Sequence, residues 1–115
     1  MNIVLAQHNY HIGNFDYNTA KMLTAIDAAK AQQADLIVFS ELSVCGYPPR
    51  DFLEFSDFID QCYAQLEKLA AAANGIGVLV GGPARNPDAL GKDLFNTAFL
   101  LYNGKVQAEV HKTLL

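Results

Sequence analysis

The amino-acid sequence predicts an α/β fold, in which a β-α-β-α-β unit is followed by a β-hairpin. Short aliphatic runs alternate with segments of helical periodicity over the first part of the chain. This alternation is typical of two right-handed βαβ units and a parallel sheet. The last part instead has two strand-like segments joined by Asn103-Gly104, a dipeptide typical of a tight hairpin turn. The 115 residues correspond to one domain or part of one.

The composition indicates a globular domain and excludes several classes of function. Hydrophobic residues make up 51% of the chain and charged residues 17%, which is enough for a core and too little charge for disorder. The net charge of −4 argues against nucleic-acid binding. No apolar run approaches the roughly 20 residues that span a bilayer, so we expect no membrane association. Two cysteines and the lack of a basic n-region predict a cytoplasmic protein.

The first βαβ unit is predicted within residues 2–39. Residues 2–7 are rich in aliphatic and β-branched types, which favours a buried strand. A helix is predicted over residues 17–33, and Asp16 is expected to cap it, because its carboxylate can accept the free N–H groups of the first turn. Residues 36–39 are apolar on both faces, as in a parallel strand that helices cover.

The second half of the fold begins with a helix predicted over residues 56–73. Asn74-Gly75 is expected to end this helix. Residues 77–80 form the third predicted strand, and residues 95–102 and 105–112 form the hairpin. The apolar stripe of the helix consists of Ile59, Cys62, Tyr63, Leu66, Ala70 and Ala73.

Glu41 is the strongest candidate for a catalytic residue. Ligands of open α/β sheets bind beyond the carboxyl ends of the strands, which points to residues 7–14, 40–51 and 81–85. Glu41 follows almost directly on a buried strand, where an unpaired carboxylate is costly. It is therefore either a catalytic group or a glutamate that orders its own loop.

Lys112 is the expected partner of Glu41. Val106, Ala108 and Val110 share one face by the strand period of two, and Lys112 continues this parity. If the two segments converge, Glu41 and Lys112 form a buried ion pair. The alternative is a lysine that reaches solvent past the end of its strand.

Other reactive residue types give weaker signals. Cys62 lies in an apolar stripe, and Cys45 has no histidine near it in sequence to activate its thiol. Gly81-Gly82-Pro83 lacks the features of a phosphate loop; it either lets backbone approach a ligand or marks a strand exit where close packing excludes a Cβ. No metal site is expected, because zinc-ligand spacing is absent from His8, His11 and His111.

The segment Glu-Leu-Ser-Val-Cys-Gly-Tyr-Pro-Pro-Arg-Asp, which starts at Glu41, resembles the first catalytic segment of the nitrilase (carbon–nitrogen hydrolase) superfamily. Its Gly-Tyr-Pro-Pro-x-Asp variant, Asn96-Thr97-Ala98 and the final His-Lys-Thr-Leu-Leu are most similar to glutaminase domains of bacterial glutamine-dependent NAD+ synthetases. The resemblance extends over essentially the whole chain. It implies part of a four-layer αββα sandwich, so we expect one apolar sheet face to be exposed.

The resemblance also implies a Glu–Lys–Cys mechanism. Glu41 matches the general base, which takes the proton of a cysteine thiol that attacks the carboxamide of glutamine. Lys112 matches the lysine that stabilises the oxyanion, and Tyr47 matches a tyrosine that lines the glutamine pocket. The family's nucleophilic cysteine follows the lysine, so neither Cys45 nor Cys62 corresponds to it. A chain that ends at Leu115 is therefore expected to be inactive alone.

In the synthetases that this sequence resembles, a second domain uses ATP and Mg²⁺ to activate deamido-NAD+ for amidation by the released ammonia. We therefore expect no cofactor in residues 1–115, and ATP and Mg²⁺ in a synthetase domain of a parent protein that is a homo-oligomer. Two alternatives remain open. One is another carbon–nitrogen hydrolase, such as a free-standing amidase, and the other is a truncated, non-catalytic interaction module.

Overall fold

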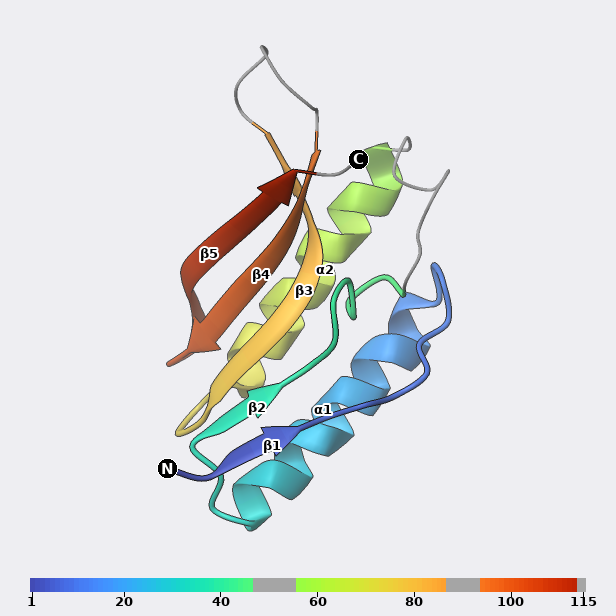
Figure 1. Cartoon of the computed structure of the whole chain (residues 1–115). Helices are drawn as coiled ribbons and strands as arrows, with labels where there is room; N and C mark the ends of the chain where they lie inside the picture. Colours follow the sequence, from blue (N-terminus) through green and yellow to red (C-terminus); the bar gives the residue numbers. More distant parts are fainter. Residues whose placement is uncertain (47–55, 87–93, 114–115) are drawn as a thin grey trace.

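The chain forms one mixed sheet of five strands, whose order follows the sequence (Figure 1). The strands β1 (Ile3–Leu5), β2 (Leu36–Val38) and β3 (Gly77–Arg85) are parallel to one another. An antiparallel hairpin of β4 (Leu94–Tyr102) and β5 (Lys105–Thr113) pairs with β3. The predicted α/β fold is therefore confirmed. The computed structural model describes residues 1–46, 56–86 and 94–113.

Two helices connect the parallel strands and lie on the same face of the sheet (Figure 1). The first, α1 (Phe15–Ala31), links β1 to β2, and α2 (Ser56–Ala72) links β2 to β3. Because the strand order advances in one direction and βαβ crossovers are right-handed, both helices pack on one side. A buried hydrogen bond of 2.7 Å from Thr19 Oγ1 to Gln65 Oε1 joins them. Neither helix of the described chain has the length and apolar content needed to cross a membrane.

The start of α1 differs from the prediction. Asn14, rather than Asp16, caps the helix, because its side-chain oxygen accepts a hydrogen bond of 3.2 Å from the backbone N–H of Tyr17. Asp16 lies within the first turn, where its negative charge interacts favourably with the positive end of the helix dipole. Both residue types are good N-caps, so the sequence did not distinguish them.

The lengths of the parallel strands also differ from the prediction. Both β1 and β2 have three residues, whereas β3 has nine and ends at Arg85. The strand β3 extends beyond the end of β2 because β4 continues to pair with it as far as Arg85. Gly81-Gly82-Pro83 therefore lies inside β3, and the interpretation of this segment as a strand exit is wrong.

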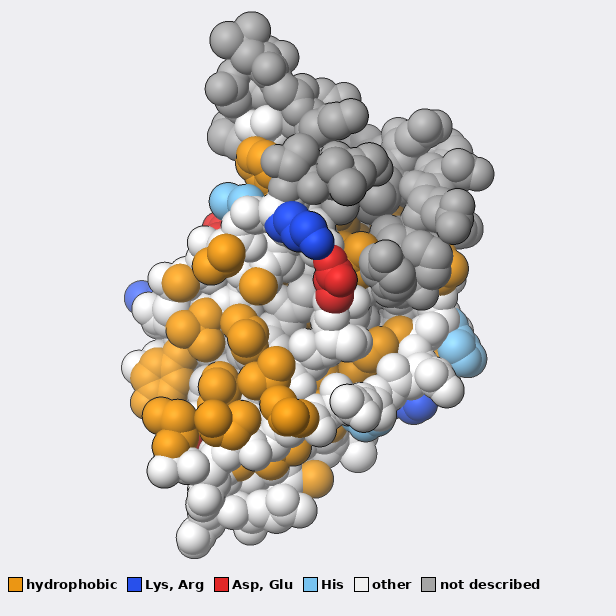
Figure 2. All heavy atoms as spheres, viewed as in Figure 1, with side chains coloured by type: hydrophobic (Ala, Val, Ile, Leu, Met, Phe, Trp, Pro, Cys, Tyr) orange, Lys and Arg blue, Asp and Glu red, His pale blue; other side chains and the backbone are white. Residues whose placement is uncertain are grey.

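In the described part of the chain, the face of the sheet opposite the helices is apolar and uncovered (Figure 2). Ile3, Leu5 and Val110 are 52%, 69% and 71% exposed. In β2, Ile37 is buried against the helices, whereas its two neighbours are only half-buried. The prediction that helices cover both faces of this strand is wrong. The expected apolar sheet face is exposed, and the sheet and helices are consistent with two layers of an αββα sandwich.

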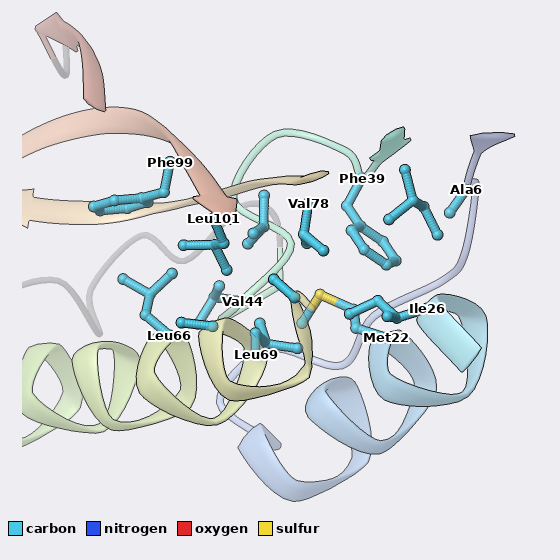
Figure 3. Close-up of a cluster of buried hydrophobic side chains, with 14 of the residues drawn as sticks. Ala6, Met22, Ile26, Phe39, Val44, Leu66, Leu69, Val78, Phe99 and Leu101 are labelled. Atoms are coloured by element: carbon cyan, nitrogen blue, oxygen red, sulfur yellow. The ribbon is translucent and has the colours of Figure 1, made fainter. Parts of the chain in front are cut away.

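The core lies between the other face of the sheet and the two helices (Figure 3). Met22 and Ile26 of α1, Leu69 of α2, and Leu101 of β4 are all completely buried. Burial of a side chain of this size contributes about 2 kcal/mol to folding. The predicted apolar stripe of α2 is confirmed, since every residue in it except Tyr63 is buried. This core holds the strands from which the candidate site is built.

Candidate active site

Glu41 begins the turn that follows β2, and this turn is fastened to β3. The backbone N–H of Val44 donates to the carbonyl oxygen of Gly81 at 3.0 Å. In return, the N–H of Gly81 donates to the hydroxyl of Ser43 at 3.2 Å. The carboxyl end of β2, where the sequence predicts a site, therefore holds Glu41 in a fixed position beside β3.

Gly81 allows this turn to approach β3 so closely. A Cβ at Gly81 would lie 2.5 Å from the backbone nitrogen of Leu42 and 3.2 Å from the Cα of Glu41. The interpretation that close packing excludes a Cβ here is confirmed, and the packing partner is the turn that carries the candidate base. Leu42 itself has a φ of 53°, in the left-handed region that L-residues rarely adopt. Its side chain is buried, which holds the turn in this conformation.

The Glu41 carboxylate accepts a hydrogen bond at Oε1 from the side-chain Nδ2 of Asn96 in β4. Glu41 is exposed rather than buried, because the open face of the sheet has no cover in the described residues. Lys112 is exposed as well, which agrees with the alternative that its side chain reaches solvent. Within the described chain, no ion pair of 4.0 Å or less joins Glu41 to Lys112. The predicted buried ion pair is therefore wrong.

A β-bulge determines which face of the sheet carries Lys112. Near the turn, Tyr102 pairs with Lys105, but beyond a register shift Leu100 pairs with Ala108, so that Gln107 has no partner. Lys112 then lies opposite Asn96. Had the register at the turn continued, Lys112 would have paired with Phe95 and projected from the opposite face.

The bulge also corrects the predicted parity of β5. Val106 pairs with the buried Leu101 and therefore lies on the helix side of the sheet. Of the four residues predicted to share one face, only Ala108, Val110 and Lys112 lie on the open face. The side chain of the unpaired Gln107 donates a hydrogen bond of 2.9 Å to the carbonyl of Tyr102, which ties the bulge to the turn.

Glu41 and Lys112 line the same cavity, which has a volume of about 260 Å³. Charged side chains of both signs lie at the border of the hydrophobic surface on this face (Figure 2). A carboxylate can accept a proton there, and an ammonium can stabilise a developing negative charge. The arrangement thus suits attack on a polar carbonyl compound. The lining residues are Phe39, Ser40, Glu41, Leu79, Val80, Gly81, Asn96, Thr97, Ala98, Val110 and Lys112.

Neither cysteine lines this cavity, and both are completely buried. The thiol of Cys45 donates to the carbonyls of Leu42 and Gly46, each at 3.7 Å. The neighbouring Cys45 thiol and the burial of Cys62 raise the pKa of Cys62 far above its usual range. Sequence analysis did not predict that these two thiols are neighbours, because they come from a loop and a helix.

We expect both thiols to be unreactive in the native chain. Their burial and the raised pKa of Cys62 disfavour the thiolate, which is the reactive form. Labelling by a disulfide reagent such as DTNB should be at least about 100-fold slower in buffer than in guanidinium chloride, because it requires an opening of the structure. Rapid labelling of Cys45 in the folded chain would revive it as a candidate nucleophile.

Each of the three histidines interacts with a different residue. His8 Nδ1 lies 3.3 Å from the hydroxyl of Tyr10, and burial raises the pKa of Tyr10 to about 12. His11 stacks on Tyr17 with 4.0 Å between ring centroids, and His111 Nδ1 is 2.9 Å from the hydroxyl of Thr97. In the described ranges, no group of three metal-ligating side chains could hold a metal ion.

One residue predicted for the site lies outside the described residues, and one residue of the site was not predicted. Tyr47 lies outside the described residues, so its position relative to the cavity stays a prediction. The Asn96-Thr97-Ala98 motif does not predict the role of Asn96 in this site. Its contact with Glu41 joins β4 to the turn after β2, and no local sequence pattern reports such a contact.

The chain is similar in sequence and in fold to known proteins. The family model described as carbon-nitrogen hydrolase matches residues 3–115. A glutamine-dependent NAD(+) synthetase from Synechocystis sp. is 39% identical over 117 residues, which cover 98% of this chain and 21% of the relative. Similarly, a glutamine-dependent NAD(+) synthetase from Xanthomonas campestris is 34% identical over 97% of this chain and 20% of the relative. The chain thus spans about a fifth of the length of these curated relatives.

The chain also matches a solved structure, of which it covers a larger share than it covers of the curated relatives. An amidase from Nesterenkonia sp. superposes with a TM-score of 0.80 at 25% identity, over 100% of this chain and 43% of the amidase. Both groups of relatives are consistent with the family model, which covers all but the first two residues. The chain belongs to the carbon–nitrogen hydrolase family.

Proposed function

We propose that the chain forms the first part of a glutaminase domain, which hydrolyses the side-chain amide of glutamine and delivers ammonia to a synthetase domain that makes NAD+. The observation that supports this most directly is the cavity shared by Glu41 and Lys112. A carboxylate and an ammonium beside one pocket can serve as the general base and the oxyanion-stabilising group of cysteine-dependent amide hydrolysis. The similarity to curated glutamine-dependent synthetases over 98% of the chain supports the choice of glutamine.

In the proposed mechanism, Glu41 acts as the general base. Its second oxygen, Oε2, takes the proton of a cysteine thiol, and the sulfur attacks the amide carbon of glutamine. The Lys112 ammonium stabilises the negative charge on the carbonyl oxygen of the tetrahedral intermediate. Glu41 then gives its proton to the leaving ammonia, and a thioester remains. Water attacks the thioester while Glu41 again accepts and returns a proton, which releases glutamate and the free thiol.

The nucleophile of this mechanism is neither Cys45 nor Cys62, because both are buried and neither lines the cavity. We propose that the cysteine follows Leu115 in a longer protein, so that residues 1–115 alone do not hydrolyse glutamine. Tyr47 is proposed to line the glutamine pocket. ATP and Mg²⁺ are proposed to act in the synthetase domain, and no residue of this chain is assigned to them.

A free-standing amidase is the second candidate. The Nesterenkonia amidase supports it, because this chain superposes on 43% of that protein with a TM-score of 0.80. The same two charged groups would serve that reaction, with a simple amide in place of glutamine. The two candidates therefore differ in substrate and in the protein that surrounds the site, rather than in chemistry.

The full-length protein that contains this chain distinguishes them. We expect it to release glutamate from glutamine, and to form NAD+ from deamido-NAD+ and ATP with either glutamine or ammonia as the nitrogen source. Ammonia serves as the internal control, because it bypasses the glutaminase site. Hydrolysis of simple aliphatic amides without NAD+ formation would favour the amidase, and the absence of both activities would favour a non-catalytic interaction module.

A further inference from the structure

Asn96 lies between the two proposed catalytic groups. Its side-chain amide donates to Oε1 of Glu41, and its backbone pairs with Lys112 across the hairpin. Residues directly opposite one another in an antiparallel pair project from the same face, with their Cβ atoms about 5 Å apart. Asn96 therefore contacts the proposed base and is the direct neighbour of the proposed oxyanion-stabilising lysine.

The position of Asn96 bears on a physical problem of this site. A carboxylate and an ammonium that line one cavity attract each other, and the attraction grows as the two charges approach. An ion pair between them would occupy the oxygen that must accept a proton and the ammonium that must meet the oxyanion. Glu41 nevertheless bonds to Asn96, and no ion pair with Lys112 forms among the described residues.

We propose that Asn96 is a positioning residue, which holds one oxygen of Glu41 and keeps the carboxylate from closing onto Lys112. This inference rests on the proposed function, since it assigns Asn96 a role in that same reaction. The side-chain N–H occupies Oε1 and leaves Oε2 directed to the thiol. Lys112 then keeps its ammonium for the substrate oxygen. The backbone of the turn is held separately at Gly81, so the task of Asn96 is confined to the carboxylate.

Three replacements of Asn96 in the full-length protein test this role. Asn96→Ala removes the donor and is expected to lower kcat for glutamine hydrolysis about 30-fold, with KM within about threefold, because a misplaced catalytic group affects the reaction rather than binding. Asn96→Asp keeps the shape but places a second carboxylate beside Glu41 and Lys112, and should lower kcat at least about 100-fold. Asn96→Gln retains an amide donor and should recover much of the rate.

The order of the variants separates positioning from a merely structural role. If Asn96 only fills space, Asn96→Asp is more active than Asn96→Ala, and that order would overturn the proposal. Wild-type kcat in both variants would overturn it as well. Asn74 provides the matched control, because its side chain also donates one hydrogen bond, to Ala71 O at 2.8 Å, at the end of α2. Asn74→Ala and Asn74→Asp should leave kcat unchanged.

A parallel Glu41→Gln variant distinguishes failure of this proposal from failure of the proposed function. If Glu41→Gln is inactive while the Asn96 variants match the wild type, only the role of Asn96 is wrong. If Glu41→Gln retains wild-type hydrolysis, Glu41 is not the base and both proposals are wrong. Ammonia-dependent NAD+ formation and thermal unfolding of each variant show whether it is folded. If Asn96→Ala does not fold, the kcat of Asn96→Gln is used for the test instead.

Discussion

Glu41→Gln is expected to lower glutamine-dependent activity of the full-length protein by about 1,000-fold, while ammonia-dependent NAD+ formation is unchanged. An amide cannot accept the thiol proton, and a positioned general base contributes about 100- to 10,000-fold to a rate. The amide oxygen of glutamine can still accept the hydrogen bond that Asn96 donates to Oε1. The loss should therefore be chemical, with little change in stability.

The measurement compares glutamate release and NAD+ formation from glutamine with NAD+ formation from ammonia. Glu67→Gln is the matched control, because Glu67 is an exposed glutamate of α2 that does not line the cavity. It should retain wild-type activity with both nitrogen sources. More than a tenth of the wild-type glutaminase rate in Glu41→Gln would exclude Glu41 as the base.

Gly81→Ala is expected to damage stability and activity together. The new Cβ would lie 2.5 Å from the Leu42 nitrogen, so the turn that carries Glu41 must move away from β3. Overpacking of this kind typically costs about 1–3 kcal/mol of unfolding free energy. A displacement of Glu41 by about 1 Å should also lower glutaminase kcat about 100-fold.

Gly82→Ala is the matched control for this change. A Cβ at Gly82 would meet Phe99 and Val44 side chains at 3.6 Å, which is an ordinary packing distance. Urea unfolding of residues 1–115 measures stability, and the full-length protein reports activity. Equal unfolding free energies for the two variants would contradict the close approach at Gly81.

Much of the fold could be predicted because local patterns determine it. The apolar stripe of α2 and the Asn103-Gly104 turn each reflect short-range periodicity or backbone preference, and both occur as expected. The lengths of β1 and β2 could not be predicted, since a strand ends where its neighbour stops pairing. The N-cap of α1 was ambiguous because Asn14 and Asp16 are both suitable.

The candidate site shows a similar division. Glu41 was located because it follows a strand at the carboxyl edge of a parallel sheet, where such sheets bind ligands. Its exposure was not predicted, because burial depends on what covers the open face of the sheet. The contact of Asn96 with Glu41 depends on the tertiary arrangement of two distant segments. The face that carries Lys112 depends on one unpaired residue, Gln107.

That unpaired residue makes the hairpin unequally tolerant of insertions and deletions. Removal of Gln107 would leave every pair from Ala108 to Lys112 unchanged, because Gln107 has no partner in β4. A residue added between Ala108 and Lys112 would instead reverse the side from which Lys112 projects. A length change of one residue in β5 can therefore preserve the position of Lys112 or remove it from the site, depending on whether it occurs at the bulge or between the bulge and Lys112.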